Sequence, residues 1–141
     1  MAANGSAQWQ GDLKSGGGTF IAGADLNGEY SFKSRFEDGP GANPEQLLAA
    51  AHAACFSMAL AGALGDAGTP VASVKTDAVA TIRFMGGAWT IATIALSTVG
   101  DVPGIDEATF QAAARAAKDD CPVTRALAGG SAQITLKASL A

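Results

Sequence analysis

The sequence has few charged residues and few of the side chains that bind metals or nucleic acids. Charged residues make up 16% of the 141 residues, the net charge is -4, and there is one histidine. The basic residues are scattered and form no patch that would bind phosphates, which disfavours a nucleic-acid-binding protein. An apolar content of 48% excludes a disordered chain, and the length fits a single domain over residues 1–141.

Cysteine is equally scarce, since Cys55 and Cys121 are the only two. Two cysteines are too few for a disulfide scaffold but enough for one redox couple. The first residues lack the basic and apolar segments of a secretory signal, which favours a cytoplasmic protein. In that compartment a cysteine pair is more often catalytic, redox-active or metal-binding than structural. A metal site built from His52 and both cysteines would have only three soft ligands without paired spacing, so we expect no metal and no bound cofactor.

Charge is absent altogether from Gln46 to Gly65. This run is long enough to cross a bilayer, but it is mostly alanine, so we expect a helix buried within protein and no membrane association. Asn43-Pro44-Glu45 has the residues of a helix start: a cap, a proline at the first helical position and an acid near the positive end of the dipole. One six-stranded sheet would cover only one side of such a helix. We therefore expect a homodimer.

The remaining patterns predict an α+β fold of the order βββ-α-ββ-α-(α)-β, with helices packed on antiparallel sheet. Asn27-Gly28 and Met85-Gly86-Gly87 both have the composition of hairpin turns. Asp106 and Pro122 each lie at the start of a predicted helix. The expected elements are strands Ala7–Asp12, Thr19–Ala24, Glu29–Arg35, Val71–Phe84, Ala88–Val99 and Ala132–Leu140, a helix from Asn43 toward Gly65 or Gly68, a helix from Asp106 through Lys118, and a short helix opened by Cys121-Pro122.

Whether Cys55 is reactive depends on its surroundings. A thiol buried among apolar side chains has a raised pKa and is inert, so a reactive Cys55 needs a nearby cation or a break in its helix. Glu45, His52 and Cys55 share one helix face, yet Glu45 and Cys55 would lie roughly 15 Å apart along a straight helix. A kink, a long bridging side chain or a partner chain would be needed to bring them together. From residue types alone, Cys55 is as well explained as a core residue, and Arg35 as a surface charge.

The segment from Asn43 to Leu60 closely resembles the central helix motif of the OsmC/Ohr family, the osmotically inducible and organic hydroperoxide resistance proteins. His52 and Val123 are similar to the osmotically inducible branch, since the hydroperoxide-resistance branch tends to carry other residues at both places. The resemblance implies an intertwined homodimer, with antiparallel β-sheets wrapped around long central helices and active sites at the interface. Further matching stretches are Trp9–Asp12, Arg35–Glu37, Val102–Ile105 and Cys121–Thr124.

The same resemblance implies a thiol-dependent peroxidase that reduces organic hydroperoxides to alcohols in oxidative or osmotic stress defence. It implies that Cys55 is the peroxidatic cysteine and Cys121 the resolving cysteine, and that the two form an intramolecular disulfide. Arg35 would stabilise the Cys55 thiolate, and Glu45 would orient Arg35. The implied partners are an organic hydroperoxide and an external dithiol or lipoyl-type reductant. Apolar neighbours of Cys55 favour alkyl hydroperoxides over hydrogen peroxide, because each buried methylene contributes about 0.8 kcal/mol.

Two other functions are compatible with parts of the sequence. A Cys–His hydrolase would use Cys55 and His52, but the sequence offers no evident orienting residue or oxyanion hole for it. A non-enzymatic, dimeric stress-response binding protein would contain both cysteines as core residues.

Overall fold

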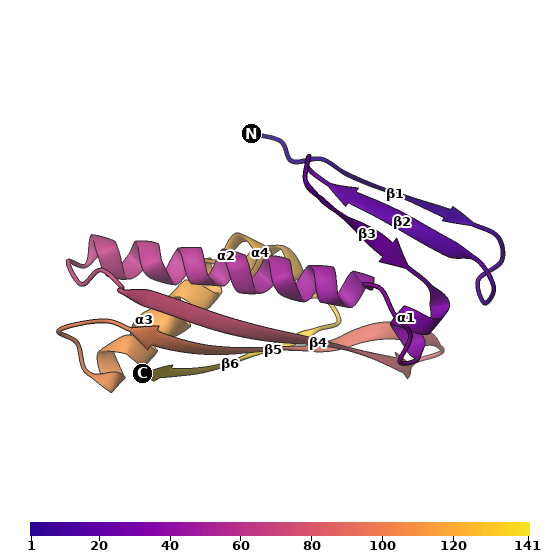
Figure 1. Ribbon diagram of the computed structural model, residues 1–141. Helices are drawn as coiled ribbons and strands as arrows, with labels where there is room; N and C mark the ends of the chain where they lie inside the picture. Colours follow the sequence, from indigo (N-terminus) through magenta and orange to yellow (C-terminus); the bar gives the residue numbers. More distant parts are fainter. The chain divides into compact units, whose positions relative to one another are not determined.

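The computed structural model describes all 141 residues, and they form two compact units, Met1–Leu47 and Leu48–Ala141 (Figure 1). Each unit contains a three-stranded sheet, whereas we expected a single six-stranded one. The predicted α+β class is confirmed. The elements are β1 Gly5–Gln10, β2 Gly17–Ala22, β3 Leu26–Tyr30, α1 Phe32–Phe36, α2 Pro44–Asp66, β4 Ser73–Met85, β5 Ala88–Asp101, α3 Glu107–Asp120, α4 Pro122–Leu127 and β6 Gln133–Leu140.

The first unit begins with the predicted antiparallel meander of β1, β2 and β3. The turn predicted at Asn27-Gly28 is wrong, because both residues are paired within β3 and the chain turns earlier, near Gly23 with its φ of 63°. Gly28 lies opposite Phe20, and a Cβ on Gly28 would lie 2.9 Å from the Phe20 ring. Glycine is therefore needed here to make room for an aromatic ring across the sheet.

A short helix, α1, replaces the end of the strand predicted over Glu29–Arg35. Ser31 Oγ accepts a hydrogen bond from the Ser34 backbone N–H at 3.1 Å, and Ser34 Oγ accepts one from the Ser31 N–H at 2.8 Å. This reciprocal capping box stabilises the start of a helix. The strand therefore ends at Tyr30, and Arg35 lies on a helix.

The predicted start of α2 is confirmed, because Asn43 Oδ1 accepts a hydrogen bond from the Gln46 N–H at 2.8 Å. The helix runs without a break to Asp66, so Gly62 does not interrupt it. It ends where the Thr69 N–H donates to the Leu64 carbonyl at 2.9 Å and Gly68 adopts a φ of 81°. This is a common way for a helix to satisfy its last carbonyls.

The sheet of the second unit has the strand order β4-β5-β6. The hairpin predicted at Gly86-Gly87 is confirmed, since both glycines have positive φ, 62° and 82°. The third strand differs from the all-antiparallel expectation, because β6 pairs with β5 in parallel. A parallel neighbour requires a crossover, and α3 and α4 make it between the two strands.

The core of the second unit lies between its sheet, α2 and α3. One stripe of α2 is fully or almost fully buried: His52, Phe56, Leu60 and Leu64. From α3, Phe110 packs so closely on β5 that a Cβ at Gly100 would lie 2.4 Å from its ring.

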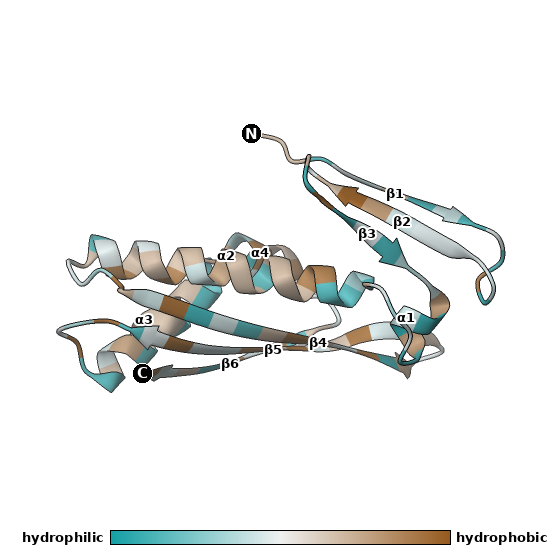
Figure 2. Ribbon diagram, in the orientation of Figure 1, coloured by the Kyte–Doolittle hydropathy of each residue, from teal (hydrophilic) through white to brown (hydrophobic).

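The opposite stripe of α2 is exposed and carries small or apolar side chains. Most of α2 is white to brown in the hydropathy colouring of Figure 2. Its composition and length would suffice to cross a membrane, but the core helix of a folded protein passes the same test. Only 22% of an apolar 18-residue window of this helix is buried within the chain, so one chain by itself does not bury the helix. The exposed residues of this stripe include Ala50, Ala54, Met58 and Gly62. The homodimer stays a prediction.

Candidate functional site

The two cysteines meet although 66 residues separate them in the sequence. Cys55 lies in the middle of α2, and Cys121 lies between α3 and α4. Their Sγ atoms are 3.1 Å apart, and both residues are free thiols. Cys55 is partly exposed, whereas Cys121 has 0% exposure. A disulfide S–S bond is about 2.05 Å long, so the sulfurs are about 1 Å from bonding distance.

Cys121 lies at the junction of two helices, where it is the C-cap residue of α3 and the N-cap residue of α4. Burial acts to raise the pKa of the Cys121 thiol. The Thr124 backbone N–H, the Cys55 thiol, the Thr124 hydroxyl and the Val123 N–H outweigh that effect, and the pKa of Cys121 is lowered. These hydrogen bonds favour the thiolate over the thiol.

The groups around Cys55 have the opposite net effect and raise its pKa. Burial raises the pKa of the Cys55 thiol, and its hydrogen bond with Cys121 raises the pKa further, while the Val123 N–H acts against both. No basic side chain is among the groups that shift the pKa of Cys55. A reactive Cys55 thiolate therefore needs a cation in addition to its contacts within the second unit.

His52 lies one turn before Cys55 on α2 and has 0% exposure. Its Nε2 is 2.8 Å from Thr124 Oγ1, while its Nδ1 is buried without a partner. Burial lowers the pKa of His52, so the ring is neutral near pH 7. Neither ring nitrogen bonds to Cys55, and no group of three or more potential ligands could hold a metal ion. The structure thus contradicts the pairing that a Cys–His hydrolase requires.

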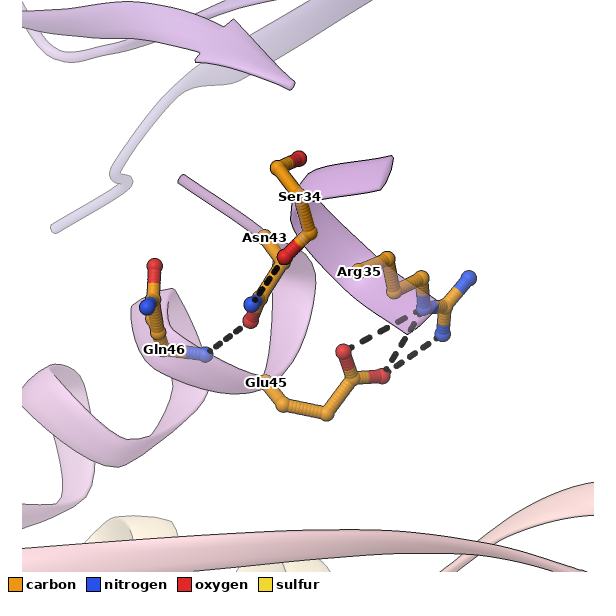
Figure 3. Close-up of polar contacts among 5 residues, drawn as sticks. All are labelled: Ser34, Arg35, Asn43, Glu45 and Gln46. Carbon is orange, nitrogen blue, oxygen red and sulfur yellow. Dashed lines mark hydrogen bonds and ion pairs between the residues drawn. The ribbon is translucent and has the colours of Figure 1, made fainter. Parts of the chain in front are cut away.

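Arg35 of α1 and Glu45 in the first turn of α2 form an ion pair (Figure 3). Arg35 Nη2 lies 2.6 Å from Glu45 Oε1, and Arg35 Nε lies 3.2 Å from both carboxylate oxygens. The Arg35 side chain is 35% exposed and the Glu45 side chain only 7%. Asn43 Nδ2 also donates to the Ser34 carbonyl at 2.9 Å, so two contacts join α1 to the start of α2. A guanidinium held in this way has a fixed orientation.

The structure thus brings together Arg35 with Glu45 in the first unit, and Cys55 with Cys121 in the second. The kink that would shorten the distance between Glu45 and Cys55 is absent, because α2 is unbroken. These two residues lie roughly 15 Å apart along its axis. The catalytic roles of all four residues stay predictions.

Thr124 is the polar residue that sequence reasoning missed. It is buried, it contacts His52, and its hydroxyl is among the groups that lower the pKa of Cys121. One signal was available in the sequence, since a hydroxyl residue three positions after a helix-capping cysteine lies about one turn away from it. The contact with His52 spans 72 residues of sequence and had no such signal.

Comparison with known proteins places the chain in a family. The sequence model described as OsmC-like protein matches residues 37–137, which include Glu45, Cys55 and Cys121. The peroxiredoxin OsmC of Escherichia coli is 43% identical over 134 residues, which cover 94% of this chain and 92% of that relative. The chain belongs to the OsmC family. The resemblance found in the sequence motifs is confirmed.

Solved structures of OsmC and Ohr proteins share the fold of this OsmC-family chain. An organic hydroperoxide resistance protein OsmC from Legionella pneumophila superposes with a TM-score of 0.76 at 22% identity, covering 96% of each chain. The organic hydroperoxide resistance protein OhrB of Bacillus subtilis gives a TM-score of 0.73 at 21% identity, covering 98% of each. At such identities the likeness establishes the fold alone.

Proposed function

We propose that this OsmC-family protein is a cytoplasmic, thiol-dependent peroxidase that reduces organic hydroperoxides to alcohols in oxidative or osmotic stress defence. The observation that carries the proposal is the contact of the only two cysteines, with their Sγ atoms 3.1 Å apart. The name peroxiredoxin of the Escherichia coli relative supports it, as do the hydroperoxide-resistance names of the structural neighbours.

In the first step, Cys55 is the nucleophile because it is the more exposed of the two thiols. Its thiolate attacks the terminal oxygen of the hydroperoxide, the O–O bond breaks, and the alkoxide takes up a proton to leave as the alcohol. Cys55 becomes a sulfenic acid. The apolar side chains of α2 favour hydroperoxides with an alkyl group, because that group is buried on binding.

In the second step, the Cys121 thiolate attacks Cys55 Sγ. The S–S bond forms as the S–O bond of the sulfenic acid breaks, and the departing hydroxide is protonated to water. The disulfide protects Cys55 from further oxidation. An external dithiol, of lipoyl or similar type, then reduces the disulfide by thiol–disulfide exchange and returns both cysteines to the free form.

Arg35 is the cation that we assign to the Cys55 thiolate, with Glu45 fixing its orientation. The unbroken α2 removes the kink and leaves a bridging side chain or a partner chain. Of these two we propose the partner chain, so that Arg35 and Glu45 act on Cys55 of a second copy in a homodimer. The exposed stripe of small residues on α2 supports this assembly, because small side chains allow two helices to approach closely. A guanidinium near the sulfur would lower the thiol pKa and stabilise the charge that develops in the reaction.

The decisive experiment follows consumption of cumene hydroperoxide with excess dithiol. We expect Cys55→Ser to lose turnover completely, and Cys121→Ser to consume one equivalent and then over-oxidise to the sulfinic acid. Mass spectrometry of the wild type after one equivalent should show a Cys55–Cys121 disulfide. Full turnover by Cys55→Ser would disprove this mechanism. A wild type that consumes no hydroperoxide would favour the non-enzymatic binding protein.

Complementation between subunits tests the position of Arg35. In a mixture of Arg35→Ala and Cys55→Ser chains, a heterodimer contains one complete site only if Arg35 acts across the interface. We therefore expect mixing and re-association to restore activity that neither variant has alone. Activity that stays at the sum of the two separate variants would show that Arg35 acts within its own chain.

A further inference from the structure

A chain of side-chain contacts leads from His52 to the resolving cysteine. His52 Nε2 lies 2.8 Å from Thr124 Oγ1, and Thr124 lies about one helical turn after Cys121, with its hydroxyl among the groups that lower the pKa of that thiol. Both His52 and Cys121 have 0% exposure, and Thr124 has 5%. The proposed reaction uses Cys121, and neither His52 nor Thr124 takes part in it.

The unpartnered Nδ1 of His52 determines which nitrogen carries the proton. A proton on Nδ1 would be a buried N–H without an acceptor, and orphaned donors of this kind are rare in proteins. A neutral ring with its proton on Nε2 leaves only an acceptor lone pair unsatisfied. Burial keeps the ring neutral by lowering the pKa of His52. His52 Nε2–H therefore donates to Thr124 Oγ1.

This donation fixes the direction of the Thr124 hydroxyl. Because Thr124 Oγ1 accepts from His52, its own proton is free to donate to another atom. A threonine near the start of a helix can turn its hydroxyl to the carbonyl three residues earlier, which here belongs to Cys121. The contact with His52 competes with that arrangement and leaves the hydroxyl proton available to Cys121 Sγ.

We propose that His52 is a positioning residue that holds the Thr124 hydroxyl on Cys121 Sγ and so prepares this sulfur to close the disulfide. Its part in turnover rests on the proposed peroxidase function, but the contacts themselves do not. A hydrogen bond from Thr124 favours the thiolate, which is the form that attacks the Cys55 sulfenic acid. The attack forms S–S, breaks S–O and releases hydroxide, which is protonated to water.

Few other ionisable groups act on Cys121. Cys55 contacts it from α2, and His52 reaches it through Thr124. Asp119 and Asp120, which precede it on α3, and Arg125 on α4 are all exposed. Their effects are screened by solvent, so a change at His52 should dominate the titration of Cys121.

The first test measures the pKa of Cys121 from thiolate ultraviolet absorbance, in a Cys55→Ala background that leaves a single thiol. We expect His52→Leu to leave roughly threefold to tenfold less thiolate near neutral pH, the effect of one lost hydrogen bond. His52→Gln, which can still donate to Thr124, should restore most of it. Ser57→Ala is the matched control, because it removes another 2.8 Å hydrogen bond from α2 that does not lead to Cys121.

Thr124→Val and Thr124→Ser repeat the test without changing His52, in case His52→Leu does not fold. We expect valine to raise the pKa of Cys121 and serine to leave it nearly unchanged. Adding His52→Leu to Thr124→Val should have little further effect, since both act through one hydroxyl. Each of three results would overturn the proposal. The pKa of Cys121 could be unchanged in Thr124→Val, it could shift equally in Ser57→Ala, or the shifts could add in the double variant.

A second test separates this inference from the proposed function. In full-length protein with both cysteines, one equivalent of cumene hydroperoxide should oxidise wild type and His52→Leu at the same rate, because Cys55 reacts first. The variant should then form its disulfide roughly threefold to tenfold more slowly, with more sulfinic acid at Cys55 and recovery at higher pH. Slowing of the first step alone would overturn the inference. A wild type inert to hydroperoxide would refute the peroxidase, while the titration of Cys121 would still decide whether His52 acts on it.

Discussion

Cys55 and Cys121 are chemically identical side chains that their surroundings make unequal. Burial and the other thiol raise the pKa of Cys55, while backbone and hydroxyl donors at the start of α4 lower that of Cys121. Within a single chain, Cys121 is therefore the thiol that ionises more readily. The peroxidatic role proposed for Cys55 needs a nearby cation, so substitution of Arg35 is the sharpest test of that role.

We expect Arg35→Ala to raise the pKa of Cys55 and to lower the rate of the first oxidation by roughly tenfold or more, since removing a cation from a thiolate costs more than a neutral hydrogen bond. Arg35→Lys should recover only part of the rate, because an ammonium lacks the planar fork that binds both Glu45 oxygens. The measurement is the iodoacetamide alkylation rate against pH in Cys121→Ser protein. Arg115→Ala, an exposed change on α3, is the control. An unaltered profile would contradict the assignment.

His52 also predicts how stability depends on pH. Burial puts the pKa of His52 in the folded protein below its ordinary value of 6.5, so the unfolded chain binds the proton first as the pH falls. The stability that neutral His52 contributes to the folded protein is present above about pH 6.5. It is lost as the pH falls toward the lowered pKa. Urea unfolding at fixed protein concentration should show a smaller loss of stability between about pH 7 and about pH 5 in His52→Gln than in wild type. Parallel pH curves for the two proteins would contradict this.

At the scale of elements, the start of α2 has one residue with two functions. Asn43 Oδ1 caps the helix, and Asn43 Nδ2 holds α1 through the Ser34 carbonyl. The same helix turn carries Glu45, whose carboxylate orients Arg35. The position of Arg35 thus depends on a local cap and on a short helix that begins with its own capping box.

Substitutions at Asn43 separate these two contacts. Asn43→Ala should lower the free energy of unfolding by about 1 kcal/mol or more, because the cap is lost together with the bond to Ser34. Asn43→Asp keeps an oxygen for the Gln46 N–H and loses only the donor. It should therefore retain most of the stability while loosening α1. Chemical denaturation measures the first effect, and hydrogen exchange at α1 measures the second. Equal stability of wild type and Asn43→Ala would refute the role of the cap.

At the scale of the whole molecule, the decisive feature is the exposed stripe of α2. Met58 on this stripe is 77% exposed, in a helix whose other side forms the core. A helix this apolar is ordinarily covered by protein, and a second copy of the chain provides matching small side chains.

Met58→Glu should therefore dissociate the dimer, because it places a charge in the proposed interface. We expect a smaller species in analytical ultracentrifugation. If Arg35 acts across the interface as proposed, peroxidase activity should fall in parallel. Ala116→Glu puts the same charge on an exposed face of α3 and should change neither. A wild type that is a folded monomer at micromolar concentration would refute the homodimer, and an intact Met58→Glu dimer would move the interface elsewhere.

The sequence by itself determined what depends on neighbouring residues. The Asn43 cap, the Gly86-Gly87 hairpin and the Pro122 helix start are local patterns, and all three were predicted. The family followed from long motifs around the cysteines. The Asn27-Gly28 turn was predicted wrongly, because Gly28 makes room for Phe20 on the neighbouring strand and does not form a turn.

Only the tertiary structure decided what depends on long-range contacts. It placed β6 parallel to β5 and buried His52 against Thr124 across 72 residues. The family resemblance implied that Cys121 meets Cys55, but residue spacing did not, since 66 residues separate them. Residue types and spacing fix the chemistry that each side chain can perform. The pKa of a thiol and the direction of a hydroxyl are set by the atoms that folding puts beside them, and those atoms come from distant parts of the chain.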